Sequence, residues 1–346
     1  MIKLNLVIDR LLLGKDLSVR EMKDAFRYLF LTKKSNLNFG ATVLLLLQKK
    51  GIHLNELYGL VKLVHELEPP LRLGKSLTLV DGCGTGGDNA HTFNISTLAC
   101  LVASGAGASI AKHGNRSISS QCGSSDLMES LGVRIDASPK LMLHAIEKHG
   151  FGYFHAPLYH PIFKRIQPIR QSLGRKGIKT IFNLVGPLVN PLRPKRQVIG
   201  VFRKDYAAIV AQTAKKIGYD HAVVFYNLGG FDELTIFSKA FLFEIKRHQL
   251  NHSIFNPREL KLRSGNKNEI AGKNKKYNTR LAHQILLGKV KGTKRNVVIL
   301  NAAAILYVAG LAKSIKEGLS LSAESIDSGS AWKSLQNLVK SSHDSR

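Results

Sequence analysis

Residues 81 to 126 read DGCGTGGDNAHTFNISTLACLVASGAGASIAKHGNRSISSQCGSSD, and this stretch decides the fold of the chain. An apolar segment, residues 77–80, precedes it and predicts a strand that ends at once in a loop with four glycines. Glycine lacks a Cβ, so such a loop can adopt left-handed backbone angles and bring its N–H groups close to an anion. The beginning of the stretch therefore predicts a strand followed by a phosphate-binding loop.

The remainder of this stretch predicts a helix, a second strand and another polar loop. Small and apolar residues 98–103 follow NIST, residues 94–97, whose Asn, Ser and Thr are preferred helix caps. Free N–H groups at a helix start favour anions. Residues 108–111 resemble a strand and lead into KHGNR, residues 112–116, with two cations. Each feature alone is often only structural, but the combined unit indicates a polyanion site.

The composition bounds the class of protein. The net charge is +27, from 51 Lys and Arg against 24 Asp and Glu. Nucleic-acid binding can explain such an excess, but few aromatics lie in the densest basic patch, residues 258–295, so nucleic acid is not expected as the main ligand. The three cysteines lack paired spacing, and no apolar run reaches the ~20 residues of a membrane span. We expect a cytoplasmic protein without a membrane segment.

The periodicity of the chain changes near residue 73. Before it, a capping box at Ser18 and Glu21 opens a helix, and an apolar-periodic run over residues 54–67 stops before two prolines. After it, strands alternate with helices, which implies a mostly parallel central sheet flanked by helices. The fold class is therefore α/β. We expect a small all-helical domain, residues 1–72, joined by helices from about 162–190, and a larger α/β domain, residues 73–346, that binds the substrate.

Two further features point to chemistry outside the glycine-rich stretch. Asp232 and Glu233 follow a buried strand, residues 222–227, at the end where open sheets bind their ligands. Such a pair is usually a solvated turn, but magnesium relieves the repulsion between neighbouring carboxylates. Arg170 lies on a helix-like segment, residues 161–173, on or near its surface. Arginine can bind a carboxylate bidentately, although most helical arginines face water, so the residues alone leave its role open.

Ordered motifs across nearly the whole chain resemble the anthranilate phosphoribosyltransferase family. They are GTGGD (84–88), TFNIST (92–97), KHGNRSISS (112–120), GSSDLMESLGV (123–133), FNLVGPLVNP (182–191), GGFDELT (229–235), NVVILNAAAILY (296–307) and AESIDSGSA (323–331). The resemblance implies an enzyme of tryptophan biosynthesis that transfers the phosphoribosyl group of 5-phosphoribosyl 1-diphosphate to the amine of anthranilate, releasing pyrophosphate. It also implies Mg2+ as cofactor and a homodimer that is joined through the helical domain.

The resemblance also assigns the site. The substrate-binding residues that it implies are Gly84, Thr85, Gly87, Asp88, Thr92, Asn94, Ile95, Ser96, Thr97, Lys112, His113, Gly114, Asn115, Arg116, Ser119, Ser120, Ser124 and Arg170. Among these, Asn115 and Arg170, with Gly84 nearby, would orient anthranilate. The implied metal residues are Ser96, Asp232 and Glu233. His113 is expected to position a substrate, with help in proton transfer as the alternative, and no general base is identified.

Two segments depart from the family's pattern. Arg175-Lys176-Gly177 resembles a short insertion beside the expected wall of the substrate site. Asn274 and Tyr277 stand where the family usually has acids, which puts any role of those acids in doubt.

Two alternatives are weighed against this interpretation. A pyrimidine-nucleoside phosphorylase has a similar architecture, but its glycine loop differs and it is not expected to use Asp232 and Glu233 as a metal pair. A non-catalytic homologue that binds nucleic acid need not keep the GTGGD, NIST, KHGN and DE motifs, all of which are present here. The motifs therefore favour the transferase.

Overall fold

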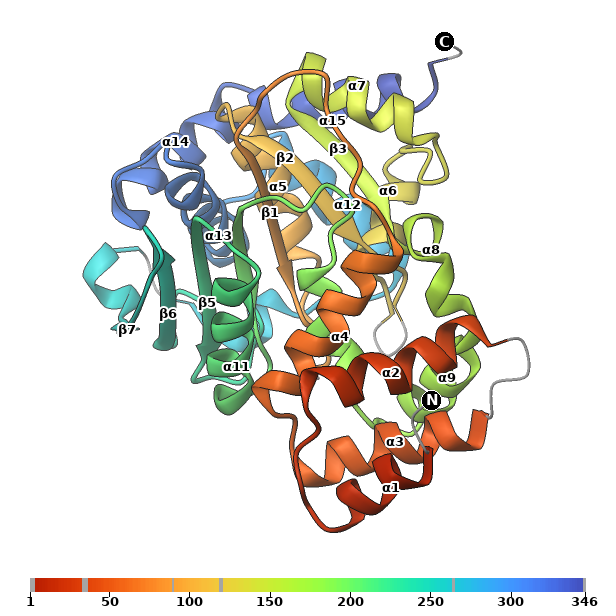
Figure 1. Cartoon of the computed structure of the whole chain (residues 1–346). Helices are drawn as coiled ribbons and strands as arrows, with labels where there is room; N and C mark the ends of the chain where they lie inside the picture. Colours follow the sequence, from red (N-terminus) through yellow and green to blue (C-terminus); the bar gives the residue numbers. More distant parts are fainter. Residues whose placement is uncertain (1–3, 33–36, 89, 118–120, 263–264, 345–346) are drawn as a thin grey trace.

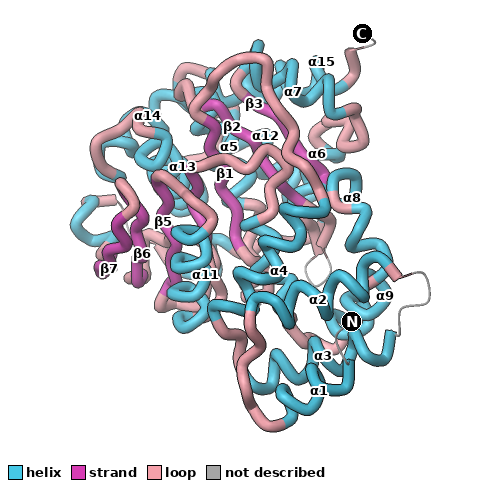
Figure 2. The backbone as a smooth tube through the Cα atoms, in the orientation of Figure 1, coloured by secondary structure: helices cyan, strands magenta, loops and turns pink. Residues whose placement is uncertain are grey.

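The computed structural model describes residues 4–32, 37–88, 90–117, 121–262 and 265–344. Within this part of the chain, seven strands form one sheet in the order β3-β2-β1-β4-β5-β6-β7. Figure 2 shows the strands in magenta with helices in cyan around them. Neighbouring strands from β3 through β5 are parallel, whereas β6 and β7 are antiparallel. The strands are β1 (Leu79–Gly84), β2 (Ser109–Gly114), β3 (Phe151–His155), β4 (Arg196–Gly200), β5 (His221–Asn227), β6 (Ala240–Lys246) and β7 (Gln249–Phe255). The predicted fold class, α/β with a mostly parallel central sheet, is confirmed.

Helices cover both faces of the sheet. In β5, Val223 and Phe225 belong to one hydrophobic core, and Ala222 and Val224 belong to the other, because successive side chains of a strand point to opposite faces. The helices that contribute to the first core are α5 (Ile95–Gly105), α6 (Ser124–Ser130), α7 (Pro139–His149), α12 (Lys275–Leu286), α13 (Thr293–Ala309), α14 (Ile315–Asp327) and α15 (Ser330–Ser342). The opposite face packs against α11 (Lys204–Lys216).

The amino-terminal helices lie together beside the sheet (Figure 1). Ser18 caps α2 as expected, because its Oγ accepts from the Glu21 N–H and the Glu21 carboxylate accepts from the Ser18 N–H at 2.8 Å. The helix ahead of the two prolines ends at Leu67. These helices are α1 (Leu4–Leu12), α2 (Val19–Leu31), α3 (Leu37–Lys50) and α4 (Leu54–Leu67).

A second helical segment, between β3 and β4, packs on these four helices. Phe182 contacts the rings of Phe26, Phe30 and Phe163, so this segment shares one core with α2. The helix expected over residues 161–173 is interrupted near Ile166, where a short 3₁₀ helix gives way to an α-helix. The elements are α8 (Ala156–Tyr159), η1 (Pro161–Arg165), α9 (Gln167–Arg175), α10 (Ile181–Val185) and η2 (Gly186–Leu188).

The start of the glycine loop differs from the prediction. Strand β1 continues to Gly84, so Gly82 and Gly84 lie in the strand, and only Gly86 and Gly87 have left-handed φ angles, +64° and +77°. A Cβ on Gly82 would lie 2.8 Å from Cδ1 of Ile305 in α13. The first two glycines are therefore required by close packing and not by a turn.

The polar region after β5 adds the edge of the sheet and peripheral helices. Strands β6 and β7 form an antiparallel hairpin at one edge of the sheet. Two 3₁₀ helices follow, η3 (Pro257–Leu260) and η4 (Lys267–Ile270). Among the described residues, no helix is both long and apolar enough to cross a bilayer.

Candidate active site

A cavity of about 340 Å³ opens at the carboxyl ends of β1 and β2. The glycine loop and the start of α5 line it, and α9 and α10 contribute Arg170 and Phe182 to the same lining. The sequence-predicted residues that line it are Gly84, Thr85, Gly87, Asp88, Thr92, Asn94, Ser96, Thr97, Lys112, His113, Gly114, Asn115, Arg116, Ser124, Arg170, Asp232 and Glu233. The structure thus brings together segments that are up to 149 residues apart in the sequence.

Three of the predicted residues are not placed in the cavity. Ile95 is fully buried in the hydrophobic core, so its side chain packs the first turn of α5 and does not line the cavity. The apolar side chain was included only because it stands inside the NIST motif. Ser119 and Ser120 lie outside the described residues.

The glycine loop is held against the acidic pair. The Gly86 N–H donates to Oδ2 of Asp232 at 2.7 Å, and the Asp232 N–H donates to Oδ2 of Asp88 at 3.3 Å. A side chain at Gly84 would collide with the same Asp232 carboxylate. Close contact between the loop and the turn after β5 therefore depends on glycine at position 84.

Asp88, Asp232 and Glu233 form an acidic cluster in which one carboxylate oxygen from each residue lies within 4.8 Å of the others. Thr92 donates its hydroxyl to Oε1 of Glu233 at 3.0 Å, whereas the buried Oε2 has no partner among the described residues. Burial and the neighbouring charge of Asp88 raise the pKa of Asp232 to about 7. Burial and Asp232 raise the pKa of Glu233 well above its usual range. Clustered carboxylates with an unpartnered oxygen fit a divalent cation.

The composition of this cluster differs from the predicted metal set. Asp88 was assigned to the substrate, but its carboxylate lies beside the acidic pair. Ser96 lines the same cavity at the start of α5. The signal that pointed to Asp88 was its place at the end of GTGGD, yet only the fold reveals that this loop reaches the turn after β5.

Lys112 is buried at the end of β2 and crosses toward β1. Its Nζ donates to the carbonyl of Gly82 at 2.8 Å, and its side chain is among the largest that are fully buried. The ammonium also lies in the field of the buried Asp81, which accepts from Nδ2 of Asn190 at 2.9 Å. Lys112 therefore has partners within the protein, and it also lines the cavity.

His113 is an uncharged residue of the cavity wall. Its pKa is lowered well below the usual value, first by burial and then by the fields of His160 and Lys112. Nε2 of His113 has no hydrogen-bond partner among the described residues. The ring lies 5.1 Å from that of His160, whose Nδ1 hydrogen bonds to Glu68 at 2.6 Å. This arrangement suits contact with a neutral group better than contact with a cation.

Arg170 of α9 lines the cavity. Its guanidinium carbon lies 5.0 Å from the centre of the Phe182 ring, and no carboxylate of the described residues pairs with it. Burial lowers its pKa to about 10, so it stays charged near neutral pH. Arg170 lies half-buried on the face of α9 that lines the cavity. An unpaired, desolvated cation favours an anionic ligand.

Asn94 begins α5, but its side chain does not cap the helix. Its Nδ2 donates instead to the carbonyl of Cys122 at 3.0 Å, and its Oδ1 accepts from Asn278 of α12 at 3.4 Å. The cap expected from the residue type is thus replaced by contacts with two distant segments. These contacts fix the start of α5 at the cavity.

The departures from the family pattern lie outside the cavity lining. Arg175, Lys176 and Gly177 are exposed at the end of α9. Asn274 is the N-cap of α12 and accepts from the Tyr277 N–H at 3.0 Å. No motif singles out Lys179. Its Cε would lie 3.0 Å from a Cβ on Gly87, and its ammonium lies in the field of Asp88.

The profile of the family described as "Glycosyl transferase family, a/b domain" matches residues 76–332. Anthranilate phosphoribosyltransferase from Persephonella marina is 38% identical over 325 residues, which are 94% of this chain and 95% of the relative. The enzyme of the same name from Methanococcoides burtonii is 40% identical and covers 96% of this chain and 92% of its own. The chain belongs to the anthranilate phosphoribosyltransferase family. The family expected from the motifs is confirmed.

Solved structures of anthranilate phosphoribosyltransferases agree with this membership. The structure of the Thermus thermophilus enzyme superimposes with a TM-score of 0.89 at 33% identity, covering 98% of this chain and 99% of its own. The Saccharomyces cerevisiae enzyme in complex with PRPP and Mg superimposes with a TM-score of 0.88 at 25% identity, covering 98% and 97%. The likeness extends over nearly the whole chain, so neither the phosphorylase nor the nucleic-acid-binding alternative is needed to explain the fold.

Proposed function

We propose that the chain transfers the phosphoribosyl group of 5-phosphoribosyl 1-diphosphate to the amine of anthranilate in tryptophan biosynthesis. The products are N-(5-phosphoribosyl)anthranilate and pyrophosphate. The observation that carries this proposal is the single cavity that joins the glycine loop, the NIST and KHGN segments, the acidic cluster and Arg170. A site for this reaction needs anion contacts for the phosphates, a metal site for the diphosphate and a cation for the carboxylate.

The phosphates of the donor would be bound at the start of α5 and at the glycine loop. Backbone N–H groups at the beginning of a helix are free to donate hydrogen bonds to an anion, and Ser96 and Thr97 lie in that first turn. Oγ1 of Thr97 is buried without a hydrogen-bond partner among the described residues. Gly86 and Gly87 have left-handed φ angles and line the cavity; the Gly86 N–H donates to Asp232, which leaves Gly87 as the loop glycine proposed for the phosphate. These groups account for two anion contacts.

Magnesium would be held by Asp232, Glu233 and Ser96, and the position of Asp88 adds this residue to the candidates. The acidic cluster and the unpartnered Oε2 of Glu233 fit such an ion. When bound, the ion supplies positive charge that stabilises the diphosphate as it leaves. The protein's own part is to keep the carboxylates in place through Gly86 and Thr92.

Anthranilate would lie between the KHGN segment and α9. Arg170 would bind its carboxylate, and Asn115 and the neutral His113 would orient the ring and the amine. The amine nitrogen forms a bond to the ribose carbon while the bond from that carbon to the diphosphate oxygen breaks, and the nitrogen releases one proton to the leaving pyrophosphate or to solvent. The amine is already neutral at pH 7, so positioning and electrostatic stabilisation supply most of the effect.

The direct test follows the fluorescence of anthranilate in the presence of the purified protein, phosphoribosyl diphosphate and Mg2+. We expect the fluorescence to fall only when all three are present and pyrophosphate to appear in equal amount. Fluorescence that stays constant under these conditions would contradict the proposal. Phosphorolysis of thymidine would support the phosphorylase alternative, and salt-dependent DNA binding without turnover would support the other one.

Three broader features are also proposed. Residues 1–72, together with about 162–190, would form the helical domain, and the remainder would form the α/β domain. The helical part would carry the homodimer contact, because its helices expose several large apolar side chains, which are Leu6, Leu12, Leu13, Leu31, Leu37 and Leu45. A cytoplasmic location agrees with three free cysteines. Light scattering of the purified protein tests the dimer.

A further inference from the structure

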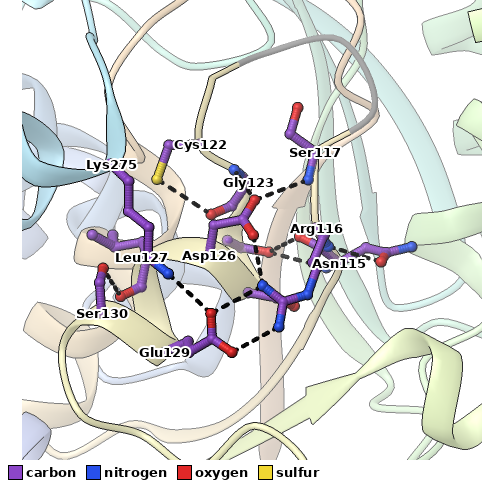
Figure 3. Close-up of polar contacts among 12 residues, drawn as sticks. Asn115, Arg116, Ser117, Cys122, Gly123, Asp126, Leu127, Glu129, Ser130 and Lys275 are labelled. Carbon is purple, nitrogen blue, oxygen red and sulfur yellow. Dashed lines mark hydrogen bonds and ion pairs between the residues drawn. The ribbon is translucent and has the colours of Figure 1, made fainter.

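Arg116 belongs to the KHGNR segment, but its guanidinium is bound by two carboxylates of α6 (Figure 3). Its Nη2 donates to Oε1 of Glu129 at 2.7 Å, and its Nη1 donates to Oε2 of Glu129 at 3.0 Å and to Oδ1 of Asp126 at 2.8 Å. The pair with Glu129 is therefore bidentate, which is the strongest geometry of this type. Three N–H donors of Arg116 are thus used within the protein.

The same two carboxylates fix the segment between β2 and α6. Oδ2 of Asp126 accepts from the N–H of Gly123 at 2.9 Å and from the N–H of Ser117 at 3.2 Å. One side chain therefore binds the backbone on both sides of this segment. Asn115 lies next to Arg116, and its carbonyl accepts from Ser125 N–H at 3.1 Å. The shape of the KHGN end of the cavity thus depends on contacts with α6.

Lys275 connects this network to a helix that lies far along the chain. Its Nζ donates to Oε2 of Glu129 at 2.9 Å, and it occupies the first residue of α12. A cation at a helix N-terminus opposes the helix dipole, and the first turn of α12 has no acid, so Glu129 supplies the compensating charge. One turn later, Asn278 donates to Asn94 at 3.4 Å. The start of α12 therefore contacts Glu129 of α6 and Asn94 at the start of α5.

We propose that Glu129 and Lys275 are positioning residues for the two substrates, which act through Arg116 to hold residues 115–117 and 121–124 in the shape that binds phosphoribosyl diphosphate and anthranilate. The proposal rests on the proposed function. Arg116, expected from the motif to contact the substrate, then serves mainly to anchor its own segment. The side chains of Arg116, Glu129 and Lys275 are 45%, 41% and 44% exposed, so their removal costs the whole protein little stability. The loss of order is confined to the backbone that Arg116 and Asp126 hold.

The first test measures steady-state kinetics of Glu129→Gln and Lys275→Gln. We expect the KM values for phosphoribosyl diphosphate and for anthranilate, whose proposed partner Asn115 lies in the same segment, to rise about three- to tenfold, while kcat changes less than about twofold. Lys276→Gln is the matched control, because Lys276 is an exposed neighbour on α12 that makes no ion pair with the described residues. Its constants should equal those of the unmodified chain. Equal changes in the Lys276 and Lys275 variants would overturn the proposal.

A double-mutant comparison asks whether Glu129 acts through Arg116. In an Arg116→Ala background, Glu129→Gln should change the KM for phosphoribosyl diphosphate by less than about twofold, because the residue that it holds is gone. An equal fold-change in this KM with and without Arg116→Ala would show that Glu129 does not act through Arg116. Should Glu129→Gln fail to fold, Lys275→Gln tests the network with the Arg116 pair intact.

The proposed function and the positioning role of Glu129 and Lys275 can fail separately. If the unmodified chain consumes no anthranilate with phosphoribosyl diphosphate and Mg2+, the proposed function fails. If it is active and both the Glu129→Gln and Lys275→Gln variants match it in every constant, only the positioning proposal fails.

Discussion

Gly84 leaves no room for a side chain because the carboxylate of Asp232 occupies the space in which a Cβ would stand. This contact joins the end of β1 to the turn after β5, two segments that are 148 residues apart. It sets the distance between the phosphate-binding loop and the candidate metal ligands. The site therefore depends on the absence of a methyl group as well as on the presence of charged residues.

Gly84→Ala should remove activity through this contact. The added methyl group would push the Asp232 carboxylate away from the Gly86 N–H, so kcat/KM should fall by about 100-fold or more. Anthranilate consumption measures the effect. Gly74→Ala is a suitable control, because Gly74 is exposed and its added Cβ would meet only a carboxylate oxygen of Glu147, at 3.3 Å. A fully active Gly84→Ala variant would show that the contact does not set the site.

Asp232→Asn should stabilise the metal-free protein and inactivate the enzyme. At pH 8 in EDTA, the substitution removes one of three clustered carboxylates. Loss of about 1 kcal/mol of repulsion between these carboxylates would raise Tm by roughly 2 °C. In Mg2+, the same variant should lose the stabilisation that the ion gives to the unmodified chain. Thermal unfolding with and without Mg2+ measures both effects. The exposed Asp9→Asn serves as control, and equal Tm changes in the two variants would disprove the explanation.

Arg170→Gln should weaken anthranilate binding. Loss of a charged hydrogen bond costs roughly 1.5–3 kcal/mol, which corresponds to a rise in the anthranilate KM of about ten- to hundredfold. The KM for phosphoribosyl diphosphate should change much less. Arg175→Gln removes the same charge from an exposed position on the same helix and should leave both constants unchanged. An unaltered anthranilate KM in the Arg170 variant would exclude this role.

His65 should make the protein less stable in mild acid. Burial, followed by the field of Arg193, lowers its pKa from 6.5 to about 4, and its Nε2 hydrogen bonds to the carbonyl of Leu188 at 3.1 Å. The unfolded chain binds this proton more readily, so stability is complete above pH 6.5 and is lost as pH falls toward 4, by ~3 kcal/mol at most.

Urea unfolding of His65→Gln between pH 7 and pH 4 checks this effect. The variant should show a shallower loss of unfolding free energy than the unmodified chain, because it lacks the titrating group. His252→Gln, in an exposed position of β7, should keep the original slope. If the unfolding free energy of all three proteins falls equally with pH, His65 is not the source of the instability in acid.

The regular elements could be predicted because their signals are local. The residues that mark a helix end lie next to that helix in the sequence. The structure places caps at Ser18, with Glu21, for α2 and at Ser138 and Gly150 for α7. The alternation of strands and helices after residue 73 was sufficient for a mostly parallel sheet. The end of β1 could not be predicted in this way. Its glycines fit against side chains of α13 and of the turn after β5, far along the chain.

The site could be assembled from motifs, but the partners of its side chains could not. The motifs placed Lys112, Arg116 and Asp88 near a phosphate ligand, and all three line the cavity. The partners of two of these side chains, however, lie on other elements. The Lys112 ammonium donates to the carbonyl of Gly82, and the Arg116 guanidinium donates to the carboxylate of Glu129. No spacing rule reveals such pairings, because they depend on how β2, α6 and the loop after β1 meet in space.

The aromatic contacts of Phe182 have a consequence for dissecting the molecule. Its ring packs on Phe26 and Phe30 of the amino-terminal helices, although its own segment also walls the cavity. A shortened chain beginning at residue 73 would leave this aromatic surface bare to water and prone to self-association. The first four helices are thus not a removable appendage, and a minimal catalytic fragment must retain them.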